Sequence, residues 1–382
     1  MDYKRLPKLR IGNLEADIPI IQGGMGIGVS LSGLASAVAN EGGIGVISAA
    51  GIGMFEPDFN RDVTGANERA LRREIRKART MTNGIIGVNI MVALTDYYDL
   101  LRIAVDECVD LVFLGAGLPL KIPPTLLPDG LEKITPKVVP IVSSARTARL
   151  IFQYWQKHYN HVPDALVIEG PLAGGHLGFR KEQISNYDYA LEKILPEVIS
   201  VMKPYELHFN KSIPVIAAGG VYTGADIHNF IQLGAQGVQM ATRFVATHEC
   251  DASQEFKNAY INCRKEDLTI IDSPVGLPGR AIRNGFLEKV SAGNKRPFKC
   301  HWLCLKTCDV ENSPYCICAA LTNAKKGQLE KGFAFAGANA YRVNTITSVK
   351  KLVETLLTEY DNAALHTKQH EISKQPESVV IN

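Results

Sequence analysis

The sequence lacks the long apolar runs and the strong net charge that mark several classes of protein. No stretch reaches the roughly 18 apolar residues of a membrane-spanning helix. The opening MDYKRLPKLRIGN has no apolar core of signal-peptide length. The net charge of +3 over 382 residues is too weak to favour a nucleic-acid or membrane surface. We therefore expect a cytoplasmic protein that binds neither nucleic acid nor membrane.

Two motifs are also missing. No glycine fingerprint is followed, about 20 residues later, by an acid that would bind ribose, which argues against a dinucleotide-binding sheet. No cysteine pair has the C-x₂-C spacing typical of iron–sulfur ligands. What remains is the composition of an ordinary globular protein, 46% hydrophobic and 21% charged.

Eight short apolar runs, rich in β-branched residues, end in glycine or other small residues. Because they are apolar throughout rather than alternating, they predict strands buried on both faces of a parallel sheet. The gaps between them mostly hold amphipathic helical patterns. The eight runs are DIPIIQGG (17–24), IGVISAAG (44–51), IIGVNIMV (85–92), DLVFLGAG (110–117), KVVPIVSS (137–144), ALVIEGP (165–171), SIPVIAAGG (212–220) and QGVQMATRF (236–244).

Eight consecutive strand–helix units predict a (β/α)₈ TIM barrel, with a doubly wound sheet as the alternative. We assign residues 1–250 to this barrel. About a hundred residues separate the eighth strand from the last clear helix, 348–360, which is too long for a loop. We expect residues 251–340 to form a smaller inserted domain over the barrel mouth. Residues 341–382 would hold the last barrel helix and a tail that loses structure after Tyr360.

The ends of the seventh and eighth strands suggest a phosphate site. Gly219 and Gly220 precede a helix that starts at Thr223, and the N–H groups there would attract an anion. Thr242, after the eighth strand, would add a hydroxyl and further N–H groups. Barrels of this kind usually bind phosphate at these two strand ends. A tight turn beside an ordinary strand end is the alternative.

The other strand ends suggest a flat ring and one acid or base. Glycines in QGGMGIG and in EGPLAGGH would let a planar ligand approach the backbone, since they have no Cβ. Asn89 lies inside an apolar run, where a buried amide needs partners. His176, with a pKa expected near neutrality, could move a proton.

Flavin mononucleotide (FMN) combines such a ring with such a phosphate. Pyridoxal phosphate would need a Schiff-base lysine at a strand end. Lys137 begins its strand and so stands at the wrong end of the barrel. We therefore expect FMN as the cofactor and no metal.

The segments IQGGMG, GVNIMV, EGPLAGGHLG, PVIAAGGV and GAQGVQMATRF resemble the nitronate monooxygenase family, once called 2-nitropropane dioxygenases. The flavin-dependent enoyl-acyl-carrier-protein reductases share the same fold and motifs. The resemblance covers residues 15–250 in order and implies an FMN-dependent oxidoreductase with His176 near the reactive face of the ring. The residues that it implies for cofactor binding are Gly23, Gly24, Met25, Asn89, Glu169, Ala173, Gly174, Gly175, Gly219, Gly220, Gln239, Met240, Ala241 and Thr242.

The resemblance implies oxidation of alkyl nitronates with O₂. The alternatives are an NAD(P)H-dependent enoyl-thioester or other acceptor reductase, and a phosphate-binding barrel without catalysis. Two positions depart from the family, which often has glutamine in place of Glu169 and glutamate in place of Leu172. A carboxylate beside a flavin would disfavour its anionic reduced form unless Glu169 were protonated. Arg280, Arg283 and Tyr341 are candidates for substrate contact or for a structural role.

A cysteine-rich segment, KCHWLCLKTCDVENSPYCIC, contains five of the eight cysteines and His301. On one helix, Cys300 and Cys308 would stand about 12 Å apart, too far to share one zinc ion. Cys304 and Cys308 with Cys316 or Cys318 would be the nearest approach to a metal site. Buried free thiols, a metal or iron–sulfur centre, and a redox-active or disulfide-bonded set all remain open.

Overall fold

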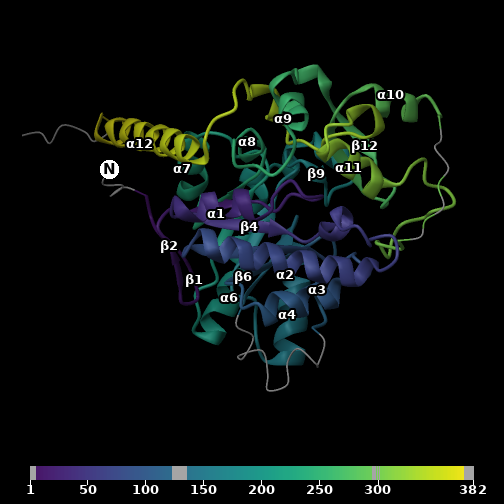
Figure 1. Ribbon diagram of the computed structural model, residues 1–382. Helices are drawn as coiled ribbons and strands as arrows, with labels where there is room; N and C mark the ends of the chain where they lie inside the picture. The colour runs from purple at the N-terminus through teal and green to yellow at the C-terminus, as the bar shows by residue number, and fades with distance from the viewer. Residues whose placement is uncertain (1–5, 123–135, 295–297, 299, 301, 374–382) are drawn as a thin grey trace, which may run out of the picture.

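Eight parallel strands close into a barrel, and they fall within the eight runs predicted from the sequence (Figure 1). The computed structural model describes residues 6–122, 136–294, 298, 300 and 302–373. The predicted TIM-barrel fold is confirmed. The strands, in their order around the barrel, are β3 (Ile20–Gln22), β4 (Ile44–Ser48), β5 (Ile85–Met91), β6 (Leu111–Gly115), β7 (Lys137–Val142), β8 (Leu166–Glu169), β10 (Val215–Ala218) and β11 (Gly237–Met240), which pairs back with β3.

The strands are mostly apolar because both of their faces are buried. In β6, Leu111 and Phe113 belong to one core cluster, and Val112 and Leu114 belong to the other. Since successive side chains of a strand point to opposite faces, one cluster fills the barrel and the other lies under the helices.

A hairpin closes the N-terminal end of the barrel. Its strands, β1 (Leu9–Ile11) and β2 (Leu14–Ala16), pair antiparallel and place Leu9, Ile11 and Ala16 in the inner cluster. Gly237, at the start of β11, lies against Leu9. The sequence analysis did not identify this hairpin, because three residues per strand are too few to display a period.

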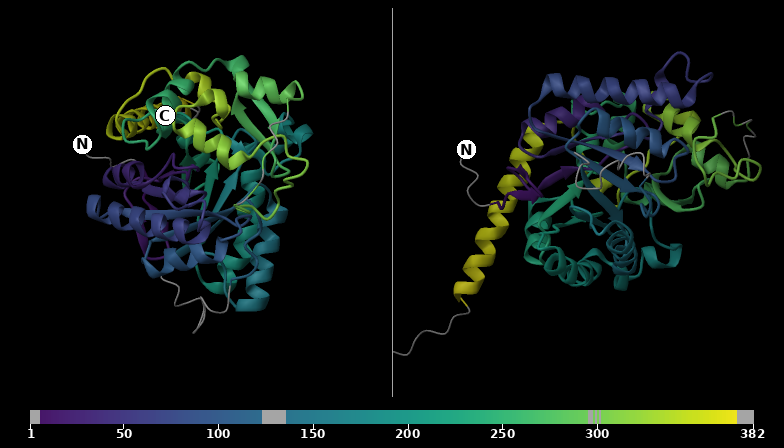
Figure 2. Two further views of the ribbon diagram at one scale, coloured as in Figure 1. Left: turned by 45° about the vertical axis from the view of Figure 1, so that its right-hand side comes forward. Right: turned by 90° about the horizontal axis from the view of Figure 1, so that it is seen from below.

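Helices surround the barrel (Figure 2). α12 packs against α7 and also contacts α1. It continues to Ser373, so the expectation that the chain loses structure after Tyr360 is wrong up to that residue. α6 contains Pro196 and Pro204, which obscured its pattern in the sequence. The helices are α1 (Ser32–Asn40), α2 (Val63–Met81), α3 (Tyr97–Asp106), α4 (Ala145–Tyr159), α5 (Lys181–Ile184), α6 (Leu191–Phe209), α7 (Gly224–Gln232) and α12 (Val349–Ser373).

The segments between β11 and α12 gather at one end of the barrel, at the top of Figure 1. Two of their strands extend β9 (Gly175–His176) into a three-stranded antiparallel sheet, in the order β12-β13-β9. His176 therefore belongs to a sheet outside the barrel, built largely from residues about a hundred positions later. The elements in this region are α8 (Thr242–Val245), α9 (Gln254–Ile261), β12 (Leu268–Asp272), β13 (Pro278–Ile282), α10 (Gly285–Ser291) and α11 (Ile317–Lys325).

Candidate active site

A cavity of about 300 Å³ opens at the carboxyl ends of the barrel strands. Its walls combine strand ends with later segments of the chain, including Trp302, Cys304, Leu305 and residues 335–339. The cavity brings together His176 and every residue predicted to bind the cofactor. Those residues are Gly23, Gly24, Met25, Asn89, Glu169, Ala173, Gly174, Gly175, Gly219, Gly220, Gln239, Met240, Ala241 and Thr242.

Neighbouring glycines in this wall serve different purposes. A Cβ on Gly174 would lie 2.5 Å from the backbone of Ala336, so Gly174 allows close packing of two chain segments. A Cβ on Gly175 would have no protein atom within 4 Å, and Gly175 has a φ of +77°. Because Gly175 lines the cavity, its missing side chain leaves space there for a ligand.

Asn89 presents an amide to the cavity. Its backbone carbonyl accepts a hydrogen bond from Ala49 N at 2.9 Å. Its side chain packs so close to Gly24 that a Cβ there would lie 2.4 Å from Asn89 Cβ. Within the described residues, the Asn89 amide group has no hydrogen-bond partner. A ring nitrogen or carbonyl of a flavin would supply one, so this residue fits the predicted cofactor.

The anion site differs in part from expectation. At the start of α7, the N–H groups of Tyr222 and Thr223 already donate to the Asp226 carboxylate at 3.0 and 2.8 Å. The N–H of Gly224 donates to Glu359 at 2.7 Å. These acids occupy the helix N-terminus, so the expectation that α7 would itself attract the phosphate is wrong.

The free N–H groups lie immediately before α7 and at the start of α8. Gly219 and Gly220 adopt φ values of +85° and +106°, and no described group accepts from the N–H groups of Gly220, Val221 or Thr242. The Thr242 hydroxyl accepts from Gly337 N at 3.3 Å. This arrangement fits the phosphate of FMN, which TIM barrels bind between the loop after the seventh strand and a short extra helix.

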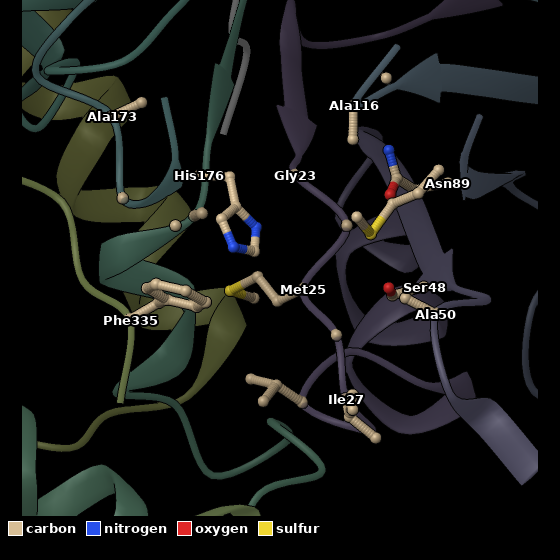
Figure 3. Close-up of a pocket in the computed structure, with 18 of the residues that line it drawn as sticks. Gly23, Met25, Ile27, Ser48, Ala50, Asn89, Ala116, Ala173, His176 and Phe335 are labelled. Carbon is tan, nitrogen blue, oxygen red and sulfur yellow. The ribbon is translucent and has the colours of Figure 1, made fainter. Parts of the chain in front are cut away.

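His176 is held by contacts from two distant segments. Its Nε2 lies 2.7 Å from Ser273 Oγ, and its ring packs edge to face with Phe335 at a centroid distance of 4.9 Å. Figure 3 shows the imidazole between Phe335 and the loop that carries Gly23 and Met25. Burial lowers the pKa of His176 to about 4, so our expectation of a pKa near neutrality is wrong. The imidazole is neutral at pH 7.

Ser273 limits what the imidazole can do. Its Oγ also accepts a hydrogen bond from Val275 N at 3.4 Å. If Nε2 carries the proton and donates to Ser273, then Nδ1 is left as a base. In the other tautomer, Ser273 donates to Nε2 and Nδ1 becomes a donor. The sequence analysis did not identify Ser273 or Phe335, because nothing near either residue reveals that β13 pairs with β9.

Glu169 ends β8 and also faces the cavity. No described residue forms a hydrogen bond or an ion pair with its carboxyl group. Burial raises the pKa of Glu169 to about 7, so near neutral pH a large share of these groups is protonated. A neutral carboxyl at this position would tolerate added charge nearby better than a carboxylate would.

Arg280 has a structural role. It is buried, and its Nη1 donates to the carbonyls of Pro171 and Ala173 at 2.7 and 2.5 Å. These bonds fix the turn that leads into Gly174 and Gly175. Arg283 donates to the carbonyl of Glu266 at 2.9 Å, outside the cavity. Tyr341 lies under Lys265 and also does not line the cavity.

The parallel barrel and the cavity at its mouth define a TIM-barrel enzyme. A family model described as nitronate monooxygenase matches residues 8–116 and 95–359, nearly the whole chain. The chain belongs to the nitronate monooxygenase family. The predicted enzyme class, an FMN-dependent oxidoreductase, is confirmed at the level of this family.

Curated relatives carry two kinds of name. A probable nitronate monooxygenase from Staphylococcus aureus (strain Newman) is 29% identical over 304 residues, which are 73% of this chain and 79% of that protein. A (3aS,4S,5R,7aS)-5-hydroxy-7a-methyl-1-oxo-octahydro-1H-indene-4-carboxyl-CoA dehydrogenase from Mycobacterium tuberculosis is 27% identical over 277 residues. That match spans 72% of this chain and 66% of the dehydrogenase, just under two thirds of its length.

Solved structures share the fold over nearly its full length. FabK from Thermotoga maritima has a TM-score of 0.71 and 28% identity, and the match covers 93% of this chain and 96% of FabK. Nitroalkane oxidase from Streptomyces ansochromogenes has a TM-score of 0.69 and 22% identity, covering 92% and 98% of the two chains. At that identity, the second likeness shows the fold alone.

In the described part of this chain, no helix is both long enough and apolar enough to cross a membrane.

Proposed function

We propose that this protein binds FMN in the cavity and oxidises alkyl nitronates with O₂. The single observation that carries the proposal is the neutral imidazole of His176 on the cavity wall, opposite the glycine loop after β3. When bound, FMN supplies the two-electron redox chemistry, and the protein positions the reactants. The family match supports the reaction type, and the curated relative from S. aureus bears the corresponding name.

The cofactor would use the residues whose polar groups lack partners. Asn89 would hydrogen-bond the ring system, and Gly23, Gly24 and Met25 would lie against it. The backbone of Gly174 and Gly175 would pass beside the ring. The turn at Gly219 and Gly220 and the segment 239–242 would hold the phosphate, through the free N–H groups of Gly220, Val221 and Thr242.

His176 would act on the substrate. A nitronate spreads one negative charge over two oxygens, and a neutral imidazole with a proton on Nδ1 would donate a hydrogen bond to one of them. With the proton on Nε2, Nδ1 would instead offer the substrate a hydrogen-bond acceptor. No lysine or arginine lines the cavity among the described residues. This favours a small substrate over one that carries several phosphates into the site.

A second candidate function is reduction of an enoyl thioester by NAD(P)H. The specific observation in its favour is the M. tuberculosis relative, whose name describes a carboxyl-CoA substrate. On this alternative, Glu169 in its protonated form would supply the proton that a reduced double bond needs.

An anaerobic titration separates the two candidates. We expect the purified protein to be yellow, with FMN released on heating, and an alkyl nitronate to bleach the flavin absorbance while NADH and NADPH do not. Bleaching by NADH or NADPH, reversed by crotonyl-CoA, would favour the thioester reductase instead. A colourless protein that takes up no added FMN would contradict both candidates.

A further inference from the structure

The cysteine-rich segment forms a sulfur-lined wall beside the cavity. A second, small cavity of about 30 Å³ is lined by all five cysteines of residues 300–318 and by apolar side chains. Cys304 and Cys318 line the large cavity as well. Nothing in the proposed oxidation of nitronates uses these thiols. His301 lies outside the described residues.

Two of the sulfurs are in contact. Cys304 Sγ lies 3.2 Å from Cys318 Sγ, whereas the other cysteines form no such pair among the described residues. A disulfide needs a separation of about 2.05 Å, so this pair is reduced and close to bonding distance. No three cysteine, histidine or acidic side chains in the described residues converge as metal ligands.

The two thiols are not equivalent. Cys304 is partly accessible, whereas Cys318 is 8% exposed. The hydrogen bond from the Cys318 thiol lowers the pKa of Cys304, and the same contact and burial raise the pKa of Cys318. Since the thiolate is the nucleophile in disulfide exchange, Cys304 is the attacking sulfur and Cys318 the resolving one.

The pair joins two walls of the large cavity. The backbone carbonyl of Cys304 accepts from Thr95 N at 3.2 Å, which fastens its segment to the loop after β5. Cys318 lies in the first turn of α11, whose Thr322 contacts Met54 in the loop after β4. A bond between the two sulfurs would fix these walls to each other.

We propose that Cys304 and Cys318 are a redox-active dithiol that exchanges with small disulfides at the cavity wall. The Cys304 thiolate attacks one sulfur of the small disulfide, whose S–S bond breaks and releases a thiolate that takes up a proton. Cys318 then attacks the Cys304 sulfur and releases the second small thiol. Two protein thiols are oxidised to one disulfide, and one small disulfide is reduced to two thiols. This inference does not depend on the proposed nitronate activity.

Peptide mapping of the flavin-loaded wild-type protein after incubation with glutathione disulfide tests the proposal directly. We expect a peptide linked through Cys304 and Cys318, which excess dithiothreitol converts back to two thiols. A map in which both remain thiols, in which Cys304 retains glutathione without resolution, or in which either bonds Cys308 or Cys316 would overturn the proposal.

Matched variants sharpen the test. Cys304→Ser and Cys318→Ser should each abolish the linked peptide, and Cys318→Ser should leave glutathione attached to Cys304. Cys308→Ser, in the same cluster, should retain the 304–318 link. Metal analysis of the wild type supplies an independent check. About one equivalent of zinc or iron, lost in Cys304→Ser, would make this a metal site and refute the exchange function.

Discussion

At pH 7 the imidazole of His176 is neutral and about half of the Glu169 carboxyl groups are protonated, because burial moves the two pKa values in opposite directions. Burial lowers the pKa of the histidine to about 4 and raises that of the glutamate to about 7. In each case the low-polarity wall disfavours the charged form. At pH 7 the cavity therefore has no charge from His176 and a partial negative charge from Glu169, which disappears as the pH falls.

Replacing His176 with alanine should leave FMN bound and lower turnover by about 10²- to 10⁴-fold, the range for loss of a positioned acid or base. In the proposed reaction the ring would act on the substrate and not on the phosphate. Flavin absorbance of the purified variant and steady-state turnover measure the two effects separately. The turnover of Ser273→Ala should lie between those of His176→Ala and the wild type. His158→Ala changes an exposed side chain of α4, and its turnover should match that of the wild type. Loss of FMN from the His176 variant would contradict this role.

Glu169 should make the flavin-free protein less stable as the pH rises. Its carboxyl has a pKa of about 7 when folded against 4.5 when unfolded, so its contribution is complete below pH 4.5 and disappears as the pH rises to 7. Between pH 5 and 8, the free energy of unfolding of Glu169→Gln should rise relative to the wild type by about 2 kcal/mol.

Urea unfolding at several pH values measures this difference. The contribution of His176 to the free energy of unfolding changes in the other direction, because it is lost as the pH falls from 6.5 toward 4. This loss occurs in both proteins and therefore cancels in the comparison. The exposed Glu182→Gln is the control. Parallel stability curves for Glu169→Gln and the wild type would show that Glu169 is not desolvated.

At the scale of elements, the turn after β8 combines backbone freedom with an open space. Gly175 has a φ of +77° and Gly276 a φ of +81°, and a Cβ on either would meet no protein atom within 4 Å. Only Gly175 lines the cavity. An alanine would therefore strain the backbone equally at the two positions, but only at Gly175 would its methyl group enter the cavity.

Gly175→Ala should weaken FMN binding at least about tenfold, while Gly276→Ala should leave it unchanged. Each alanine costs about 1 kcal/mol of backbone strain, so stability should fall by similar amounts in the two variants. Titration of the flavin-free proteins with FMN, followed by quenching of its fluorescence, gives the dissociation constants. Equal affinities in both variants would mean that the flavin does not pass beside Gly175.

The sequence identified the eight barrel strands and the residues at their carboxyl ends because their signals are local. Apolar runs and glycines after strands follow from burial on both faces and from close approach of a ligand. The partners of His176 could not be found in this way. Ser273 and Phe335 reach it through the pairing of β9 with β13, a contact between segments a hundred residues apart that leaves no period in the sequence. The pKa of His176 was misjudged for the same reason, because it depends on these covering segments.

At the scale of the whole molecule, α12 completes the outer ring of helices between α7 and α1. Gly224, the first residue of α7, lies so close to α12 that a Cβ would stand 2.0 Å from Leu356 O and 2.3 Å from Tyr360 N. Glu359 accepts from Gly224 N in the same contact. The first residue of α7 therefore has to be glycine for α12 to pack this closely against it.

Gly224→Ala should destabilise the protein by about 2 kcal/mol, because the clash is with backbone and α12 must shift. Gly285→Ala is the matched control, since Gly285 also begins a helix and a Cβ there meets nothing within 4 Å. That variant should be neutral or more stable by about 0.5 kcal/mol. Urea unfolding measures both. Equal stabilities would show that α12 does not dock tightly at this point.

The pairing of β9 with β13 also sets an order of events during synthesis. A ribosome makes the chain from the N-terminus, and β9 emerges about a hundred residues before the strand that fixes it. Phe335, which contacts the imidazole, comes later still. Fixing of His176 is therefore a late step in biosynthesis, and a nascent chain stalled before residue 280 would have its barrel strands but not the contacts that hold the imidazole.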